Sequence, residues 1–395
     1  MIFTFEALEA AEGDALLLHW GKPADPRLAV IDGGPRGTYA RTLRPRLQQI
    51  RQSRVGRSET LPVRLAMVSH IDADHIAGMI DMFGEMVEAK EGSAPAPFEV
   101  DTLWHNSFDD LLGNDADELV DLLGPASRAT IAASTAGRPL PGGLRHDSAL
   151  VAASVNQGRQ LRDQASGLGV PFNAEFDGKL VAAEPTTKVK VDVGGGLKFT
   201  VLGPFRNRVE DLQEKWAADL RKRASRSRAE AQAIAAATQD KSVTNLASIS
   251  VLAEADGKSI LLTGDARDDD LLDGLKAAKL LRDGKCHVDV LKVPHHGSDK
   301  NVSTEFFTAV TADHYVFSAN GKHDNPDVAT FQMLTDARGR DKYTIHLTNM
   351  PKSPHGGKKF FERDQADNSR RYELIVRATR AKSLVLDLGG DALED

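Results

Sequence analysis

The segment Val68-Ser69-His70-Ile71-Asp72-Ala73-Asp74-His75-Ile76-Ala77-Gly78 decides the fold of this chain. An apolar run ends at Ser69 and a helical pattern begins near His75, which places the polar residues on a loop between a strand and a helix. Two histidines and two aspartates lie within six residues. Imidazole and carboxylate groups at this density can hold metal ions a few ångströms apart, since alternate loop residues can point to different sides. We therefore predict a metal site at one edge of a sheet.

Strand-like and helical patterns alternate on both sides of this segment. Apolar residues recur at helical spacing in two segments. They are Ile76, Met79, Ile80, Phe83 and Val87 after His75, and Leu271, Leu272, Leu275 and Ala278 after Asp265. Short apolar runs predict strands at Ala15–Trp20, Leu28–Asp32, Val63–Ser69, Phe199–Leu202, Ile249–Glu254, Ile260–Thr263, Val288–Val293 and Tyr315–Ser318. Asp256-Gly257 predicts a hairpin between two of these runs. The pattern favours an α/β fold in which helices cover layered sheets.

Two further strand ends carry residues of the same chemical types. After Ile260–Thr263 comes Gly264-Asp265, where the glycine lets the backbone bend and the two oxygens of Asp265 can bridge two cations. After Val293 comes Pro294-His295-His296-Gly297-Ser298. One of these adjacent imidazoles suits a metal ligand, and the other suits a supporting or proton-transfer group. Three strand ends therefore carry one coherent set of candidate ligands.

In order and spacing, these motifs resemble those of the metallo-β-lactamase-fold hydrolases. The family signature is His-x-His-x-Asp-His, and the branch similar to the nuclease-like domain of the DNA-uptake protein ComEC has Asp in place of the second His, as here at Asp72. Further marks of that branch are Gly13-Asp14-Ala15, Ile31-Asp32-Gly33-Gly34, Asn245–Ser250, Leu262–Asp265 and Lys292–Ser298. The resemblance covers about residues 10 to 330. It implies an αββα metallo-β-lactamase sandwich with an inserted helical or irregular region and a C-terminal extension.

The resemblance also implies a site for two divalent metal ions. By similarity, one ion is held by His70, Asp72 and His296, and the other by Asp74 and His75, with Asp265 bridging them. The ions expected are manganese or zinc, with magnesium as a further option. Asp72 shifts the preference of the site from zinc towards manganese or magnesium, because a carboxylate is a harder ligand than the imidazole it replaces.

One ligand of the family pattern is missing from its usual place. The family has a late His-Pro pair before a helix, whereas this chain has Asn325-Pro326. Pro326 is suited to be the first helical residue and Asn325 to be the N-cap, which leaves His323 as the predicted ligand. His105 is an alternative ligand, or else a histidine packed beside Trp104.

These residues predict a metal-dependent hydrolase, most simply a phosphodiesterase or nuclease that uses a hydroxide activated by two metal ions. Asp74, Asp265 and His295 are its candidate catalytic residues: either aspartate orients the hydroxide, and His295 donates a proton to the leaving oxygen. Two alternatives remain open. The same site can hydrolyse a small phosphoester or another ester, because a fold does not determine the substrate. The chain can also be a non-catalytic metal-binding module in a bacterial defence or signalling system.

We expect one domain over residues 1–395. Residues 90–195, rich in Gly, Ala, Asp and Pro, are predicted to form an insertion or cap, with a helix from Ser148 to Leu168. Residues 340–395 are predicted to form a C-terminal extension that completes the sheet, with a strand-like stretch from Tyr372 to Leu388. Asp32-Gly33-Gly34 is expected to shape a tight turn beside the site.

The composition limits the partners and the compartment. With 395 residues, 41% of them hydrophobic, the chain is long enough for a sizeable core. Fifty Lys and Arg against 57 Asp and Glu give a net charge of −7, which leaves DNA or RNA binding to a local basic patch. The candidate patch is Arg221, Lys222, Arg223, Arg226 and Arg228. A single cysteine, Cys286, suits a reducing compartment, and the sequence contains no pattern typical of a signal peptide or membrane span. We therefore expect a cytoplasmic protein with no membrane attachment.

Overall fold

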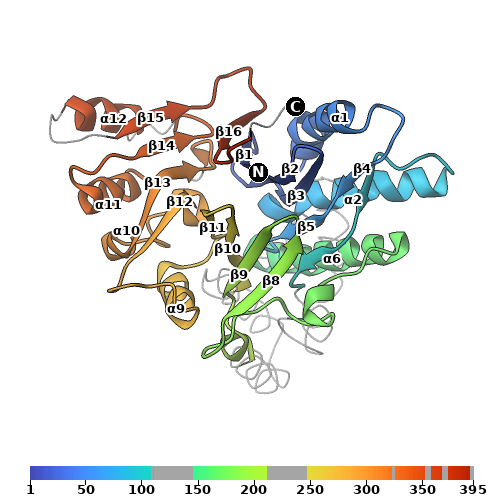
Figure 1. Ribbon diagram of the computed structural model, residues 1–395, viewed down its shortest axis with the longest axis horizontal. Helices are drawn as coiled ribbons and strands as arrows, with labels where there is room; N and C mark the ends of the chain where they lie inside the picture. The colour runs from blue at the N-terminus through green and yellow to red at the C-terminus, as the bar shows by residue number, and fades with distance from the viewer. Residues whose placement is uncertain are drawn as a thin grey trace.

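Two large β-sheets with helices on their outer faces make up most of the chain (Figure 1). The computed structural model describes residues 1–107, 110, 146–210, 247–322, 325–351, 357–366 and 372–391, with side chains except at 146–155 and 357. The sequence-based prediction of an α/β fold is confirmed at this level.

The first sheet has six strands in the order β16-β1-β2-β3-β5-β7. In chain order these strands are β1 (Ile2–Leu8), β2 (Ala15–Lys22), β3 (Asp25–Gly33), β5 (Leu65–Val68), β7 (Leu103–His105) and β16 (Ser383–Asp387). β3, β5 and β7 run parallel to one another. Their carboxyl ends therefore lie at the same edge of the sheet.

The second sheet has eight strands in the order β15-β14-β13-β12-β11-β10-β9-β8. In chain order these are β8 (Val189–Gly194), β9 (Leu197–Gly203), β10 (Ser250–Ala255), β11 (Lys258–Leu262), β12 (Cys286–Lys292), β13 (Val310–Phe317), β14 (Thr344–Leu347) and β15 (Glu373–Val376). β11 to β15 are parallel. The predicted hairpin is confirmed, because Ala255 pairs with Lys258 across Asp256-Gly257. A small additional sheet pairs β4 (Leu61–Val63) with β6 (Phe98–Val100).

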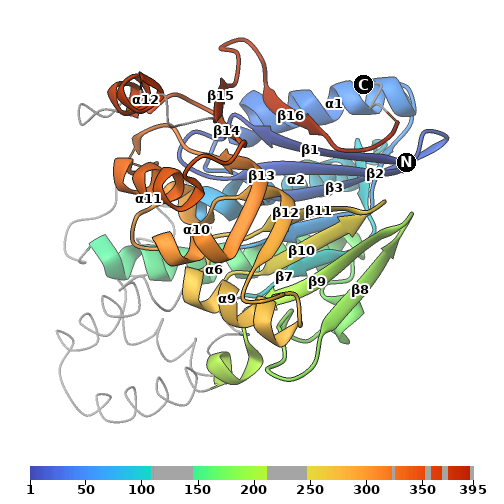
Figure 2. The same cartoon turned by 60° about the vertical axis from the view of Figure 1, so that its left-hand side comes forward.

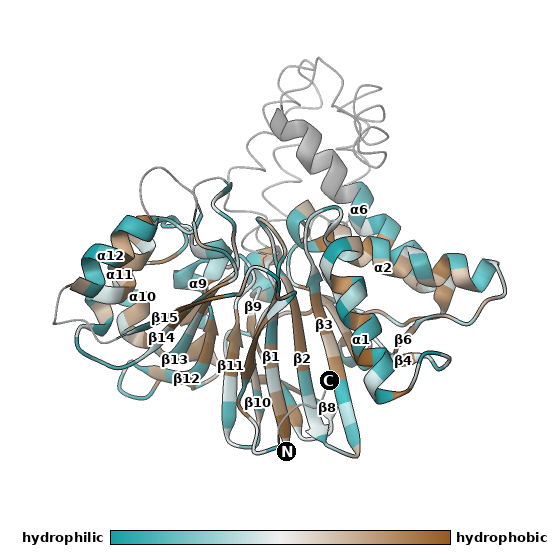
Figure 3. Ribbon diagram, turned by 90° about the horizontal axis from the view of Figure 1, so that it is seen from above, coloured by the Kyte–Doolittle hydropathy of each residue, from teal (hydrophilic) through white to brown (hydrophobic). Residues whose placement is uncertain are grey.

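Three apolar clusters arrange these elements as helix, sheet, sheet, helix (Figures 2 and 3). Between the sheets, alternate residues of β1 such as Phe3 and Phe5 pack in one cluster with Phe199 of β9. The outer face of the first sheet packs on α1 (Arg44–Arg54), α2 (Ala73–Glu91) and α6 (His146–Leu168). The outer face of the second sheet packs on α9 (Asp268–Ala277), α10 (Thr304–Ala309), α11 (Val328–Arg338) and α12 (Gly357–Ala366). The remaining short helical turns are η1 (Tyr39–Leu43), η2 (Ala174–Phe176) and η4 (Pro294–Gly297).

The predicted strands are confirmed, with one of them divided: Val63–Ser69 is shared between β4 and β5. The structure also has strands that were not predicted, namely β1, β6, β7, β8 and β14. The predicted strand-like stretch at Tyr372–Leu388 contains two strands, β15 at the edge of the second sheet and β16 at the edge of the first. Between them, Arg377 donates hydrogen bonds to the backbone carbonyls of Ala378 and Ala381. These bonds stabilise the turn that takes the chain from one sheet to the other.

The predicted insertion at 90–195 is described only in part. Its described residues include β6, β7, α6 and β8, and two of these strands belong to the main sheets. Residues 111–145 lie outside the described part of the chain. Within the described residues, no helix combines the length and the apolarity needed to cross a bilayer.

A buried charge network connects β1 to α1 behind the first sheet. Glu6, fully buried, accepts hydrogen bonds from His19 (2.9 Å to Nε2) and from the guanidinium of Arg46 (2.6 Å to Nη2). Burial alone would raise the pKa of Glu6, but these two partners lower it to about 2. The carboxylate therefore stabilises the folded state wherever it is ionised.

We expect Glu6→Gln to lower the free energy of unfolding by about 3 kcal/mol at neutral pH, because it leaves buried Arg46 without its counter-charge. The folded pKa lies below the ordinary value of 4.5. The difference between wild type and variant should therefore be constant above about pH 5 and shrink as the pH falls toward 2. Urea unfolding at several pH values measures this. The matched control is Glu362→Gln, at an exposed glutamate paired with Lys358, and a loss of equal size there would contradict the account.

Candidate functional site

The three predicted motifs meet at the edge where parallel strands of both sheets end. His75, in the first turn of α2, has its Nε2 atom 3.3 Å from Oδ1 of Asp265, which follows β11. His296, which follows β12, has its Nε2 atom 3.6 Å from the same oxygen. All three side chains are buried. The fold thus brings residues of both sheets into one cluster.

Asp32 orients the His75 ring from behind. His75 donates its Nδ1–H to Oδ2 of Asp32 at 3.0 Å, and Asp32 also accepts hydrogen bonds from the backbone N–H and the hydroxyl of Ser69. The sequence predicted only a tight turn here, and the φ of +58° at Asp32 fits such a turn. Asp32 has the additional role of fixing Nδ1 as the protonated nitrogen of His75, with Nε2 facing Asp265.

An unusual backbone aims the rings of His295 and His296 to different places. Both residues are left-handed, with φ of +45° and +55°, a conformation that is strained for residues with a side chain. His296 donates Nδ1–H to the carbonyl of Ser318 (3.0 Å), and His295 donates Nδ1–H to Oδ1 of Asn301 (2.7 Å). Each ring therefore presents Nε2 on its other side.

Asp265 lies between these imidazoles, and each of its oxygens faces a different group. Oδ1 faces His75 and His296, whereas Oδ2 lies 3.6 Å from Nε2 of His295. Gly264, at φ +52°, allows the turn that follows β11. The backbone N–H of Asp265 donates to the hydroxyl of Ser248 at 3.2 Å. The carboxylate of Asp265 therefore lies between the three imidazoles.

At the centre of the cluster, imidazole nitrogens face a carboxylate oxygen, and all of these atoms are hydrogen-bond acceptors unless one of them is protonated. Nε2 of His75, Nε2 of His296 and Oδ1 of Asp265 are buried and have no hydrogen-bond partner. A nitrogen lone pair and a carboxylate oxygen repel each other at these distances unless a proton or a cation lies between them.

Protons fill these positions when no cation is bound. Burial alone lowers the pKa of both imidazoles, but Asp265 and its neighbours raise the pKa of His75 well above normal and that of His296 to about 10. For Asp265, burial alone would raise the pKa of the carboxyl group. The nearby imidazoles outweigh this effect and keep the pKa well below its usual range. A divalent cation that displaces the protons satisfies the same atoms.

Asp74 and Asp72 lie beside different histidines. Oδ2 of Asp74 is 3.4 Å from Nε2 of His296, and its Oδ1 is 4.0 Å from Nε2 of His75. Oδ2 of Asp72 is 3.2 Å from Nε2 of His70. His70 is buried with neither ring nitrogen hydrogen-bonded; burial lowers its pKa, but Asp72 and then Asp265 raise it above normal. The His70 ring lies edge-on to the His75 ring, with the ring centroids 5.3 Å apart, so the two pairs adjoin each other.

Asp14 belongs to the cluster, although the sequence analysis did not select it as a site residue. Asp14, His75, Asp265 and His296 each offer a donor atom within 4.8 Å of the others, and this buried group can hold a metal ion. Asp14 directly precedes β2, whose residues are buried except the last. A carboxylate at the start of such an apolar strand was the available signal.

Three further predictions concern His323, the basic patch and His105. His323 and the basic residues of 221–228 lie outside the described part of the chain. His105 is buried at the end of β7 with neither ring nitrogen hydrogen-bonded, and burial, followed by Arg162, lowers its pKa to about 3. His105 is not a member of the four-residue group found among the described residues.

The predicted helix start at Asn325-Pro326 is wrong. α11 begins at Val328, with Asp327 as its N-cap residue. The backbone of Asn325 is used in a turn, because its carbonyl accepts from the N–H of Gly321 (2.9 Å) and its N–H donates to the carbonyl of Lys322 (3.4 Å). Asn325 is therefore part of the loop that precedes the helix.

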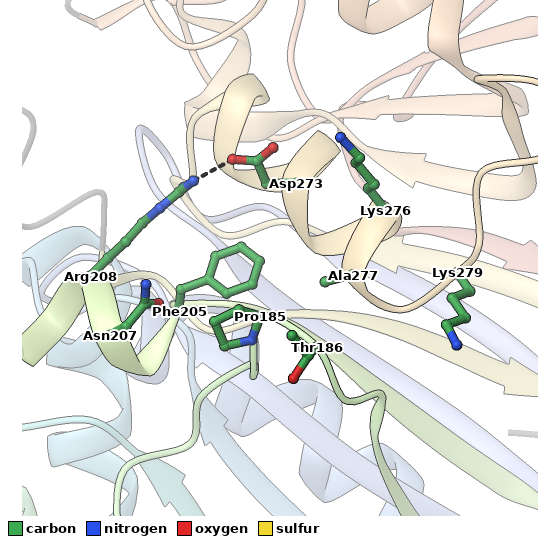
Figure 4. A pocket seen from close by; sticks show the side chains of 9 residues that line it. All are labelled: Pro185, Thr186, Phe205, Asn207, Arg208, Asp273, Lys276, Ala277 and Lys279. Atoms are coloured by element: carbon green, nitrogen blue, oxygen red, sulfur yellow. Dashed lines mark hydrogen bonds and ion pairs between the residues drawn. The ribbon is translucent and has the colours of Figure 1, made fainter.

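A separate hollow of about 480 Å³ lies between α9 and the segments around Pro185 and Phe205 (Figure 4). It is lined by Pro185, Thr186, Phe205, Asn207, Arg208, Asp273, Lys276, Ala277 and Lys279. Arg208 pairs there with Asp270 and Asp273. None of the predicted site residues lines this hollow, so it is distinct from the cluster.

Glycines let α2 approach the first sheet closely enough to place Asp74 and His75. A Cβ atom added to Gly78 of α2 would lie 1.9 Å from the carbonyl oxygen of Gly33 at the end of β3. A Cβ atom added to Gly13 would lie 1.9 Å from the carbonyl oxygen of Asp74. Both contacts are with backbone, which cannot move aside without shifting the site.

We expect Gly78→Ala to destabilise the protein by about 3 kcal/mol and to weaken metal binding, because α2 must move away from β3. The matched control is Gly84→Ala on the same helix, whose added Cβ meets only the flexible end of Gln164 at 3.3 Å. That variant should match wild type or gain up to about 1 kcal/mol from helix propensity. Urea unfolding and metal titration compare the two, and equal effects would contradict the packing account.

We expect apparent affinity for Mn²⁺ or Zn²⁺ to rise with pH. The raised pKa values of His75 and His296 mean that a cation must displace protons, and fewer protons remain to be displaced at higher pH. Calorimetric titration in buffers of different ionisation enthalpy counts the protons released on binding. Binding without proton release would contradict this description of the cluster.

No family model matches the chain, and a search of curated proteins finds no similar one. The arrangement of the side chains described above is therefore the basis on which a function is proposed.

Proposed function

We propose that this protein is a metal-dependent hydrolase of phosphodiesters, and that its substrate is a nucleic acid. One observation carries the proposal: the two oxygens of the buried Asp265 face separate sets of Nε2 atoms. A carboxylate in this position is suited to bridge two cations.

The distances suggest which residues would hold each ion. The first group of ligands would consist of His75, His296 and Asp74. The Nε2 atoms of the two histidines face Oδ1 of Asp265, and Asp74 faces Nε2 of His296. His295 faces Oδ2, and a second group of ligands would consist of His70, Asp72 and His295. This grouping differs from the one implied by the family resemblance, since His296 joins Asp74 and His75, and His295, which the resemblance does not make a ligand, takes its place beside His70 and Asp72.

The donor set fits manganese or zinc, with magnesium as a further option. It consists of imidazole nitrogens and carboxylate oxygens, a mixture suited to these ions. Cys286, the one cysteine of the chain, is buried in the apolar core between the second sheet and its outer helices, so no thiolate joins this set of ligands. The orienting hydrogen bonds at Nδ1 of three histidines are typical of metal ligands.

The layer arrangement also supports the proposal. The sequence resemblance implied an αββα metallo-β-lactamase sandwich, with the metals at the edge of both sheets. Helices pack outside two facing sheets, and the cluster lies where β5, β11 and β12 end. We propose that the chain has this fold and that residues 69–75, 264–265 and 294–298 form its metal-binding loops.

The exposed side chains of the site indicate where substrate would meet the bound metal ions. When bound, divalent cations would supply an activated water nucleophile near neutral pH and positive charge to neutralise an anionic phosphate. Asp72 and Asp74, with side chains 44% and 31% exposed, mark the side from which substrate would enter. Asp74 can accept a hydrogen bond from the nucleophile and orient it.

His295 is better suited to accept than to donate a proton. Its Nδ1–H is used by Asn301, so the free nitrogen, Nε2, carries a lone pair toward Asp265. Burial lowers the pKa of His295, and this favours the neutral ring. We therefore propose a ligand role for His295 in place of the proton donor expected from sequence.

The experiment is cleavage of end-labelled single- and double-stranded DNA by protein stripped of metal and then supplied with Mn²⁺, Mg²⁺ or Zn²⁺. We expect metal-dependent cleavage that falls by about 100-fold or more in Asp265→Asn, because the bridging charge is lost. The matched control is Asp313→Asn, at a carboxylate on β13 that is 56% exposed, and it should cleave like wild type.

Other outcomes would correct the proposal. Full activity of Asp265→Asn would contradict the assigned site. Turnover of bis(p-nitrophenyl) phosphate without DNA cleavage would indicate a small-ester substrate. Tight metal binding without hydrolysis of either substrate would indicate a non-catalytic module.

A further inference from the structure

Lys292, the last residue of β12, is fully buried beside the cluster. Its Nζ forms an ion pair with Oδ2 of Asp14 and lies 3.4 Å from the carbonyl oxygen of Gly264. Asp14 directly precedes β2 of the first sheet and Lys292 ends β12 of the second, so the ion pair joins the two sheets beneath the site. A buried ammonium group needs such partners, because it has lost its hydration.

Asp14 lies on the side of the imidazoles opposite to Asp265. Its Oδ1 is 3.5 Å from Nδ1 of His296, and its Oδ2 is 3.9 Å from Nδ1 of His75. The Nε2 atoms of the same rings face Asp265. The atoms of Asp14 are thus nearest to the ring nitrogens that carry the orienting hydrogen bonds.

We propose that Asp14 and Lys292 form a positioning pair that supports His75 and His296 from behind, and that Asp14 is not itself a metal ligand. The inference rests on the metal centre proposed above and defines which side of the two imidazoles the metal occupies. It also separates Asp14 from the other three members of the four-residue group.

The contacts of Asp14, of its loop and of Lys292 explain how the pair acts. The carboxylate of Asp14 favours the protonated Nδ1 of both rings, and so leaves Nε2 for a cation. Lys292 supplies the charge that allows this carboxylate to remain ionised while buried. The Asp14 loop is fixed by the hydroxyl of Ser318, which donates to the carbonyl of Gly13 at 2.8 Å, and by the backbone N–H of Asp14, which donates to the carbonyl of Asp74 at 3.2 Å.

A double-mutant cycle tests the pair through metal binding. The variants are Lys292→Met, Asp14→Asn and the double variant, with Co²⁺ affinity measured by chelator competition and the ligand field by the visible spectrum of bound cobalt. We expect Lys292→Met to weaken binding by about 10- to 100-fold, because Asp14 without its counter-charge no longer holds the Nδ1 side of the two imidazoles. The double variant removes both charges and should recover to within about fivefold of wild type, with an unchanged spectrum.

The matched control is the pair Lys258 and Asp289 on the same sheet, with side chains 45% and 17% exposed, changed to Met and Asn together. Its cobalt affinity should equal that of wild type. Thermal unfolding of every metal-free variant reports folding, and the charge-neutral double variant keeps the test available if Lys292→Met does not fold.

Three results would overturn the inference. If Asp14 is a ligand, Asp14→Asn and the double variant will lose affinity equally, with an altered cobalt spectrum. If the pair only stabilises the fold, the variants will melt at lower temperature but bind cobalt like wild type. A wild-type protein that binds no cobalt would contradict the proposed metal centre as well, whereas either of the first two results contradicts this inference alone.

Discussion

The repulsion between buried acceptor atoms around Asp265 is the constraint on which the site depends. Nε2 of His75 and Nε2 of His296 lie 3.3 Å and 3.6 Å from one oxygen of this carboxylate, and Nε2 of His295 lies 3.6 Å from the other. Protons or cations must lie between these atoms. The surrounding structure holds these atoms in this unfavourable arrangement. Hydrogen-bond acceptors fix the Nδ1 side of each imidazole, the backbone is left-handed at His295 and His296, and Gly264 allows the turn before Asp265.

The two-sheet architecture makes this convergence feasible. Parallel strands of both sheets end at one edge, so loops from distant parts of the sequence meet there without long excursions. Close backbone contact at Gly33 and Gly78 brings α2 onto the first sheet and fixes the start of the helix, which carries His75. Lys292 and Asp14 then connect the sheets beneath the cluster. Stability and function are coupled here, because the same contacts serve both.

Much of the site could be predicted from the sequence, since its ligand types are concentrated just after apolar strands. Residues 70–75, Asp265 and the pair at 295–296 were identified in this way, and the structure brings them together. Asp14 and Lys292 were missed as site residues because each is a single residue whose partner lies far away in sequence. The directions of His295 and His296 depend on backbone angles that residue types do not reveal. The helix start near Asn325 was wrong, because a local turn uses its backbone groups.

The most direct measurement of the central claim is anomalous diffraction from crystals grown with Mn²⁺. The account predicts a peak on the Nε2 side of His75 and His296, at about 2.0–2.3 Å from both nitrogens, in contact with Oδ1 of Asp265. A second peak beside Oδ2 of Asp265 would correspond to the group that includes His295. A peak between Asp14 and the Nδ1 atoms, or no peak from protein saturated with manganese, would contradict it.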